Sequence, residues 1–492
     1  MEKLKRAIFF WILVLMFVII TPAAVLYAKG FRFDLSRGVF VHSGTISIKS
    51  NPTDIVVSLD GKVNDSKALD KINNSYNVMG LMPKGYNLSI GADGYQTWNK
   101  NIEVHSGVAS EFWNVLLVRN EYTKTDYNTT GIEKFFISPQ SKYIIYTANS
   151  DDGLSARILD IKTKEIVGLF DFADWNFITQ DRRENIEWTP EEDYLSVPVQ
   201  KIEDGKTQFA YFIVDPNAKT SFNLNELLNN NDISYVRWDP QDKNYLFYLS
   251  NNSLYRVDIT NPADSKQIAQ DVSSFDLSKT NVYYSVVPHE LVYKNNLDGS
   301  GTPNQITSSF PEGITRNSRL IAYDDSRIAF LTQNRDLYLF NQGEFGTYTR
   351  KLGYDIEGIQ FSDDGKKLLY WTKNAMSVYY LRNWNVSPIR TENSIEDITR
   401  YSEEIKNIQW FKDYEHVIFS IGSDVKIIEL DPMDHRNIMN LPKTNSQTPL
   451  LGYNLAQERL YFVDSKDAST SLFSIILPEP TPFLGIYTPP NN

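Results

Sequence analysis

The fold of this chain is decided by a short stretch at residues 361–367, Phe361-Ser362-Asp363-Asp364-Gly365-Lys366-Lys367. An aromatic residue is followed by a small hydroxyl residue and then by Asp-Asp-Gly. This order is typical of tight turns, because Gly tolerates a positive φ and Asp bonds to nearby backbone. The turn leads into Leu368-Leu369-Tyr370-Trp371, which favours a buried strand. The stretch therefore predicts the end of one strand, a turn and the start of the next.

The same repeat motif, an apolar or aromatic residue followed by a small or polar residue and a turn, recurs along the chain. Its eight copies begin at Ile137, Trp188, Trp238, Phe275, Tyr323, Phe361, Trp410 and Tyr453. Their spacing of about 38 to 51 residues is close to the length of one four-stranded propeller blade. We therefore predict a β-propeller of about eight blades over residues 120–478, with seven blades as the alternative.

Two strands follow each copy of the motif. One is aromatic-rich, as at 245–248, and the next alternates, as at 254–258. The copy at 361–367 resembles the Trp-Ser-Pro-Asp-Gly-Lys repeat of TolB-like propellers. A propeller must close its ring, because an open ring leaves an exposed strand edge. The last apolar strand, 472–477, runs directly into Pro478, so we expect residues 121–127 to supply the missing strand of the last blade.

Residues 46–119 predict a small β-sandwich ahead of the propeller. Strands are expected at 46–50, 55–59, 86–90, 102–104 and 112–118, with a turn-rich connector at 80–85. Four segments, Ser50-x-Pro52, Val57-x-Leu59-Asp60-Gly61-Lys62, Gly80-Leu81-x-Pro83-x-Gly85-Tyr86 and Gly94-Tyr95, look like the PEGA domain, an envelope-associated β-sandwich. Pro52-Thr53-Asp54-Ile55 departs from the family pattern, because it stands where Pro-Glu-Gly-Ala is expected.

A run without a charged residue extends over residues 7–28 and follows a short basic tail at residues 1–6. At 1.5 Å per residue such a helix reaches roughly 33 Å, about the hydrocarbon thickness of a bilayer. One membrane span is therefore predicted at 7–28, with a linker at 29–45 before the sandwich. Pro22 is compatible with this helix, because it lies near one end, where backbone groups can find water.

The sequence favours a retained anchor over a cleaved signal peptide. Signal peptides have a shorter apolar centre and small residues at positions −3 and −1 of the cleavage site. Cleavage after Ala28 would place Leu26 at −3, and cleavage after Ala24 would place Pro22 there. Basic residues flank both ends almost equally, but long downstream domains translocate largely regardless of their charge. We expect a cytoplasmic N-terminus and an extracytoplasmic C-terminal bulk.

Composition excludes several classes of protein. With 49 Lys plus Arg against 61 Asp plus Glu the net charge is −12, and no concentrated basic face suits a nucleic-acid partner. The chain contains no cysteine, so disulfides and thiolate sites are excluded. Aromatic residues make up 13% of the chain, which suits packed β-sheets. The expected fold class is all-β with one transmembrane helix.

No catalytic, cofactor-binding or metal-binding residue is assigned from the sequence, and the ligand-binding residues stay unknown. HExxH, GxSxG and Walker sequences are absent. The histidines, which we expect on the surface or in turns, are His42, His105, His289, His416 and His435. Asn149-Ser150-Asp151-Asp152-Gly153 lacks the ligand spacing of an EF-hand and is expected to be a turn, as is Asp363-Asp364-Gly365. Residues 479–492 predict an extended proline-rich tail.

These features favour a non-enzymatic envelope protein that displays a propeller from a membrane. The two resemblances imply association with the cell envelope, and with cell-wall polysaccharide or another protein as the ligand. One alternative is a carbohydrate-active hydrolase or lyase with its site in the propeller channel, since paired carboxylates are neither indicated nor excluded. Another is a structural scaffold for other envelope proteins.

Overall fold

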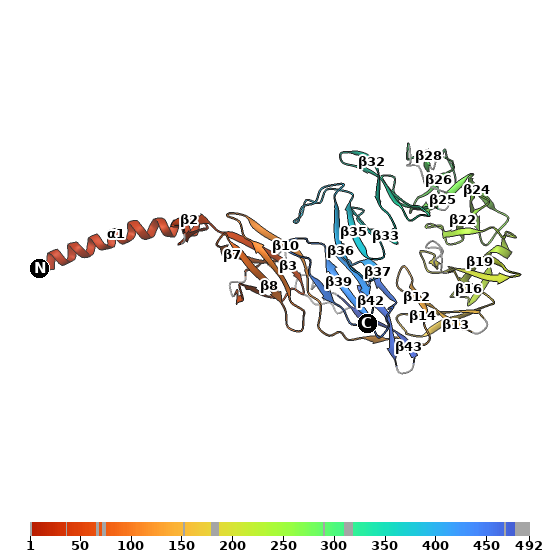
Figure 1. Ribbon diagram of the computed structural model, residues 1–492, viewed down its shortest axis with the longest axis horizontal. Helices are drawn as coiled ribbons and strands as arrows, with labels where there is room; N and C mark the ends of the chain where they lie inside the picture. Colours follow the sequence, from red (N-terminus) through yellow and green to blue (C-terminus); the bar gives the residue numbers. More distant parts are fainter. Residues whose placement is uncertain are drawn as a thin grey trace.

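The computed structural model describes residues 2–477 apart from 36, 65–67, 71–74, 151–152, 179–185, 289–290, 309–317 and 467–468. Figure 1 shows a long helix at one end, a small sandwich next to it and a ring of sheets beyond. The predicted fold class, all-β with one N-terminal helix, is confirmed. The predicted tail at 479–492, His289 and the Asp151-Asp152 turn lie outside the described residues.

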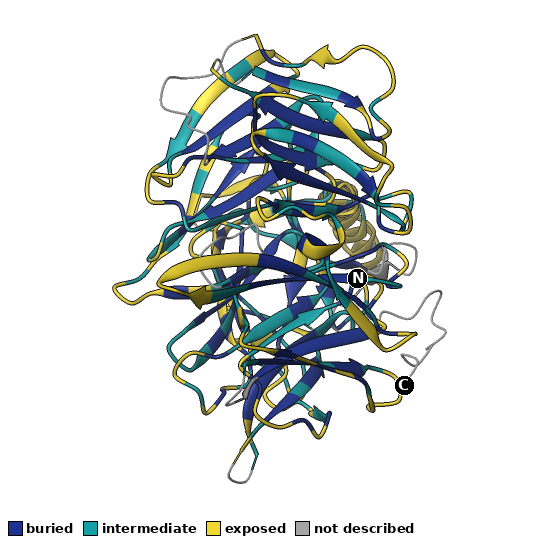
Figure 2. Ribbon diagram, turned by 90° about the vertical axis from the view of Figure 1, so that its right-hand side faces the viewer, coloured by how far each residue is buried: buried dark blue, intermediate teal, exposed yellow. Residues whose placement is uncertain are grey.

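The N-terminal helix α1 spans Glu2–Ala28 and therefore begins before the predicted span. Its segment Leu4–Ala28 is long and apolar enough to cross a membrane, and none of it is buried against the rest of the protein. In Figure 2 the helix is seen nearly end-on, and its visible turns have the colour of exposed residues. Pro22 lies inside the helix, which continues past it to Ala28.

A β-hairpin occupies much of the segment predicted as a linker. Its strands are β1 (Phe31–Asp34) and β2 (Val39–His42), which pair antiparallel with Phe33 opposite Phe40. Gly38, at φ +68°, closes the turn in a conformation that suits glycine. Neither strand was predicted, because each is only four residues long. Together they are rich in aromatic and β-branched residues, which favour strands.

Two four-stranded sheets form the sandwich. One has the order β10 (Ala109–Leu116), β3 (Gly44–Asn51), β7 (Ser75–Leu81), β6 (Ala68–Asp70); the other has the order β5 (Lys62–Val63), β4 (Val56–Leu59), β8 (Gly85–Gly91), β9 (Trp98–Glu103). The five predicted strands all occur. The sequence did not predict the strands β5, β6 or β7, and Gly80 and Leu81, expected in a connector, end β7 instead. Gly80 has φ +78°, a backbone conformation typical of turns, but it lies inside strand β7.

Eight sheets of four or five strands follow, which decides between eight and seven blades in favour of eight. Blade 1 contains β12 (Lys134–Ile137), β13 (Tyr143–Ser150), β14 (Gly153–Asp160) and β15 (Ile166–Ala173). Blade 2 contains β16 (Asn176–Phe177), β17 (Glu187–Trp188), β18 (Leu195–Glu203), β19 (Lys206–Asp215) and β20 (Thr220–Asn223), which leads into the short helix α2 (Leu224–Leu227). Blade 3 contains β21 (Ser234–Trp238), β22 (Tyr245–Ser250), β23 (Ser253–Asp258) and β24 (Ser265–Ala269).

The remaining blades repeat this plan. Blade 4 contains β25 (Val272–Leu277), β26 (Asn281–Val286), β27 (Leu291–Asn296) and β28 (Asn304–Gln305); blade 5 contains β29 (Arg319–Asp324), β30 (Arg327–Leu331), β31 (Leu337–Gly343) and β32 (Gly346–Gly353). Blade 6 contains β33 (Gly358–Phe361), β34 (Lys367–Trp371), β35 (Ala375–Tyr380) and β36 (Ile395–Arg400); blade 7 contains β37 (Ile405–Trp410), β38 (His416–Ile421), β39 (Asp424–Glu429) and β40 (Ile438–Asn440). Blade 8 contains β41 (Leu451–Asn454), β42 (Arg459–Lys466) and β43 (Ser469–Ile476).

Blade 8 takes its fourth strand from the other end of the propeller. Strand β11 (Thr125–Asp126) pairs antiparallel with β43, with Thr125 opposite Ser474. Tyr127 follows β11, is 2% exposed, and its hydroxyl lies 3.1 Å from Ser474 Oγ. This confirms the prediction that residues 121–127 complete the ring.

Every copy of the repeat motif lies at or near the end of the strand nearest the ring axis, and in several copies its aromatic residue contacts a ring of the preceding blade. The Trp188 ring stacks on Tyr143 of blade 1 with centroids 5.7 Å apart, and Trp238 stacks on Tyr194 of blade 2 at 5.9 Å. The Trp238 indole N–H also donates to the backbone oxygen of Glu187, 3.1 Å away. In these copies the aromatic residue of the motif packs one blade against the next.

The hydroxyl residue of the motif holds the turn. Ser138 Oγ accepts a hydrogen bond from the backbone N–H of Tyr143 at 2.9 Å, and Ser362 Oγ accepts one from Lys367 at 3.0 Å. Asp364 accepts hydrogen bonds from the Ser362 hydroxyl and the Lys366 backbone, so Asp363-Asp364-Gly365 is a turn as predicted. The ring stacking and the hydroxyl contact recur from blade to blade. The residue types that make them therefore recur in the sequence.

Candidate functional site at the sandwich–propeller junction

The first strands of the blades line the ring axis, since β25 contacts β29, β17 contacts β21, and β12 and β37 contact β41. Side chains on these strands accept hydrogen bonds from the next blade. The Ala322 N–H donates to Asp276 at 2.9 Å, the Trp410 N–H donates to Gln360 at 3.1 Å, and the Tyr453 N–H donates to Gln409 at 2.8 Å. These contacts fix neighbouring blades in register around the channel.

Two carboxylates of the channel share one cation. Arg237 of blade 3 lies 2.7 Å from Glu187 of blade 2 and 2.6 Å from Asp276 of blade 4. Burial raises the pKa of Glu187. Burial also disfavours the charged guanidinium, but the two carboxylates outweigh this and raise the pKa of Arg237. The channel acids thus serve as partners of Arg237 across three blades.

The most concentrated set of buried charges lies where the sandwich meets blade 7. Lys100, on the edge strand β9, is fully buried and its Nζ is 2.9 Å from Glu429 at the end of β39. The same ammonium donates to the backbone oxygens of Asp431, Met433 and His435 at 2.8–3.1 Å. A cation taken out of water needs this kind of complete pairing. One lysine thereby holds the loop after β39 to the sandwich.

Glu429 accepts further hydrogen bonds in this cluster. Its Oε2 accepts a hydrogen bond from the Trp98 indole at 2.7 Å, and its Oε1 accepts from the backbone and the side chain of Asn437 at 2.8 and 2.9 Å. Glu429 is 4% exposed and Trp98 1%. Both oxygens of this buried carboxylate are therefore satisfied, Oε2 by Trp98 and Oε1 by Asn437 and Lys100, and two of these three residues belong to the sandwich.

Side chains of the propeller also cover the free edge of β9. The Asn99 N–H donates to Asn437 at 3.3 Å, and the Asn101 N–H donates to Asp434 at 2.8 Å. An uncovered edge strand would invite pairing with another chain. The loop after β39 blocks that pairing with polar side chains, while the alternate residues of β9 face the junction core.

Apolar packing continues through the junction. The sandwich core, which includes Ile48, Trp98 and Phe112, forms one cluster with Phe411 and Ile427 of blade 7. In Figure 1 the sandwich lies directly beside β39. The sandwich and the propeller therefore share a hydrophobic core instead of being joined by a flexible connection.

A second group of buried charges joins blade 7 to blade 6. Glu415, in the turn before β38, pairs with Lys367 of β34 and lies 3.7 Å from Arg390. Arg390 also donates to the backbone oxygen of Leu430 at 2.9 Å, which connects this group to the loop that receives Lys100. Burial lowers the pKa of Lys367 and raises that of Glu415, and their mutual attraction opposes both effects.

His416 lies between the two groups. It is 4% exposed, and its Nδ1 is 2.7 Å from Asp413 Oδ2. Burial lowers the pKa of the imidazole, but the carboxylates of Asp413, Glu429 and Glu415 together outweigh it, so the pKa lies above its ordinary value. The expectation that this histidine is on the surface is wrong, because it begins β38 on the side that faces the sandwich. His42, His105 and His435 are exposed as expected.

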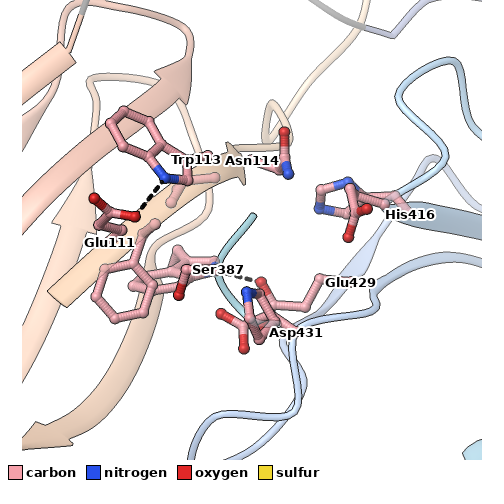
Figure 3. A pocket seen from close by; sticks show the side chains of 12 residues that line it. Glu111, Trp113, Asn114, Ser387, His416, Glu429 and Asp431 are labelled. Carbon is pink, nitrogen blue, oxygen red and sulfur yellow. Dashed lines mark hydrogen bonds between the residues drawn. The ribbon is translucent and has the colours of Figure 1, made fainter. Parts of the chain in front are cut away.

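A small pocket lies at the centre of the junction (Figure 3). Glu111 and Trp113 approach it from β10, Glu429 and His416 from blade 7, and Ser387 from the loop between β35 and β36. The register of β10 against β3 shifts between Phe112 and Val115, and such a bulge re-aims side chains. The pocket holds only ≈ 20 Å³, room for about one water. It is too small for a sugar or a peptide. The cluster therefore has a structural role, in which it holds the sandwich to blade 7.

A larger cavity of ≈ 240 Å³ lies between blades 8 and 1. Its lining is part polar and part apolar and consists of Ile132, Glu133, Ser446, Thr448, Leu450, Val463, Asp464, Ser465 and Thr470. Asp464 accepts from Lys124 at 3.0 Å and from the backbone of Asn445 at 2.8 Å, so its carboxylate is committed to structural contacts. Within the part of the chain that the structure describes, no group of three or more His, Asp or Glu side chains is arranged to hold a metal ion.

The sequence assigned no residue of the junction. One signal was present: in the alternating segment from Trp98 to Ile102, Lys100 occupies the parity of the apolar residues. A lysine on the inward face of a strand indicates a buried ion pair. Its partner Glu429 lies more than three hundred residues away in sequence, and nothing local identifies it.

Comparison with known proteins supports no family assignment. No family model matches the sequence, and no curated protein is similar to it. Among solved structures, a eukaryotic initiation factor is 12% identical, with 74% of this chain and 94% of that chain covered and a TM-score of 0.45. The β-propeller domain of Cps50 (Swd1) from Myceliophteria thermophila is 11% identical, with 61% and 98% covered and a TM-score of 0.35. Porphyromonas gingivalis dipeptidyl peptidase 4 is 9% identical, with 70% and 58% covered and a TM-score of 0.43.

Similarity at this level says nothing of partners or chemistry. Strand pairing within the chain itself defines the class, an all-β protein in which a β-sandwich is fused to an eight-bladed propeller behind an N-terminal apolar helix.

Proposed function

We propose that this is a non-enzymatic, membrane-anchored envelope protein that displays its propeller to a protein or a cell-wall polysaccharide. In this proposal α1 is a retained anchor, the N-terminus is cytoplasmic and the sandwich and propeller lie outside the cytoplasm. The sandwich is PEGA-like and the propeller TolB-like, as the sequence motifs suggest.

The observation that carries the proposal is the buried joint at Lys100. A cation fully enclosed by Glu429 and three backbone oxygens fixes one orientation of the sandwich against blade 7. With α1 at the far end of the sandwich (Figure 1), the propeller is held at a set distance from the helix. Such a rigid mount suits a protein that presents a surface.

The channel favours binding over hydrolysis. A glycosidase needs two carboxyl groups free to act as acid and base or nucleophile. Here Glu187 and Asp276 both pair with Arg237, which would have to be released before either acid could act. We therefore place the enzymatic alternative second.

Protease added to intact cells tests the placement of the propeller. We expect digestion of the large domain without lysis. Protection until the cells are lysed would reverse the orientation.

Binding is tested with the full chain in nanodiscs against purified cell-wall glycans and against envelope extracts. Saturable binding to a purified glycan supports polysaccharide display. A defined protein recovered from the extract, and not from an extract passed over empty nanodiscs, supports protein binding or the scaffold role. No binding to either would contradict the proposal.

A further inference from the structure

The β1–β2 hairpin has two chemically different faces. Phe31 pairs with His42 and Phe33 with Phe40 in the strand register, and the rings of these pairs lie 5.0 and 5.1 Å apart. Because strand residues alternate between faces, these four rings share one face. Arg32 lies on the other.

The Arg32 face is bound to the rest of the protein. The Arg32 guanidinium lies 3.8 Å from the centre of the Tyr27 ring on α1 and donates to the Tyr27 backbone oxygen at 3.2 Å. It also lies against Gly80 of the sandwich, where a Cβ would come within 2.7 Å of Nη2. The hairpin is thus clamped between the helix and the sandwich, with its orientation set.

The aromatic face is open. Phe33 is 48% exposed, Phe40 is 45% exposed, and Leu35 at the turn is 89% exposed. Lys29 and Arg37 are exposed on either side of them. Aromatic rings flanked by basic side chains are the residues that gather at the boundary between hydrocarbon and water.

The position along the chain places this face at that boundary. α1 ends at Ala28 and β1 begins at Phe31. The polar layer of a bilayer is about 5–8 Å thick on each side, and a strand of four residues is about 13 Å long. A hairpin clamped to the last turn of a spanning helix therefore begins in this layer, and it stays there when its strands run along the membrane surface.

We propose that the aromatic face of the β1–β2 hairpin is embedded in the interfacial layer of the bilayer, where it sets the angle at which the sandwich and propeller leave the membrane. This inference rests on the proposed function, because it requires α1 to span the membrane. The occupant of the face is lipid, with Lys29 and Arg37 beside the phosphate groups.

The chain contains no cysteine, so single nitroxide labels can be placed without other changes. Phe40→Cys probes the aromatic face. Val39→Cys is its matched control, because Val39 is 48% exposed but lies on the opposite face. Leu15→Cys probes the middle of α1, and Ile202→Cys, 79% exposed on blade 2, probes water. The full chain is placed in nanodiscs of phosphatidylcholine and phosphatidylglycerol in equal parts, and collisions with oxygen and with a water-soluble nickel complex are measured.

We expect the ratio of oxygen to nickel collisions at Phe40→Cys to be severalfold above that at Ile202→Cys and clearly above that at Val39→Cys. A ratio at Phe40→Cys equal to that at Ile202→Cys, with Leu15→Cys deep in lipid, would overturn the inference and leave the anchor intact. Equal ratios at Phe40→Cys and Val39→Cys would also overturn it. Water access at Leu15→Cys would instead refute the anchor itself, and the inference with it.

Discussion

The joints between blades and the joint between sandwich and propeller are built in different ways. Blades meet through ring contacts such as that of Trp188 with Tyr143, and turns within blades are held by a hydroxyl, as at Ser362. The sandwich meets blade 7 through a shared apolar core and one set of polar contacts around the buried Lys100, whose partners occur once. Apolar packing tolerates small shifts, whereas a buried ion with several fixed acceptors tolerates few. The ring is thus held by contacts that repeat from blade to blade. The orientation of the sandwich against blade 7 is set by polar contacts that occur once.

The largest effect is expected from opening the ring. Replacing residues 121–127 with a Gly-Ser sequence of equal length removes the pairing of β11 with β43 and the buried Tyr127. The loss of unfolding free energy should exceed the ~3–5 kcal/mol that truncation of one buried aromatic residue costs. Denaturant titration of the full chain in detergent measures it. The control replaces the exposed residues 300–303 in the same way, and equal stability of both variants would show that blade 8 needs no fourth strand.

Next in size is the loss of the junction lysine. Lys100→Met leaves Glu429 buried without its cation, and breaking a buried pair in this way costs about 3–5 kcal/mol. The unfolding midpoint of the full chain should fall, and protease should cut between sandwich and propeller sooner. Lys84→Met is the matched control, because the Lys84–Asp60 pair is exposed on both sides and should leave the midpoint nearly unchanged. Equal effects of the two variants would contradict the role of Lys100.

A smaller effect is expected within a blade. Ser362→Ala removes the acceptor of the Lys367 N–H, and an unsatisfied buried donor costs about 1–3 kcal/mol. The exposed Ser300→Ala serves as the control. If Ser362→Ala is as stable as the parent chain, the motif hydroxyl does not hold the turn. Unlike Lys100→Met, it should leave the contact between sandwich and propeller unchanged.

The smallest effect is a pH dependence confined to the junction. The pKa of His416 is raised above 6.5 in the folded chain. The stability that its imidazolium contributes is therefore complete below about pH 6.5 and is lost as the pH rises through the raised pKa. The difference in unfolding free energy between the parent chain and His416→Gln should be larger at about pH 6 than at about pH 9. A difference that grows with pH would mean that His416 is neutral in the fold.

The sequence revealed the parts of the molecule that repeat. All eight motif copies fall at or near the ends of first strands, and the closing role of 121–127 followed from the need to pair an edge. It did not reveal the junction, because the partners of Lys100 lie in a loop after β39 with no local signature. The burial of His416 escaped for the same reason. The hairpin at 31–42 was missed because four-residue strands give too little alternation to stand out.

A distance between two spin labels measures whether the sandwich and the propeller form one rigid unit. Val56→Cys on the sandwich and Leu169→Cys on blade 1 are exposed sites in regular strands, and the chain has no other cysteine. In the full chain in nanodiscs we predict one narrow distance distribution, which broadens when Lys100→Met is added. A broad distribution in the otherwise unaltered chain would mean that the sandwich and the propeller move relative to each other.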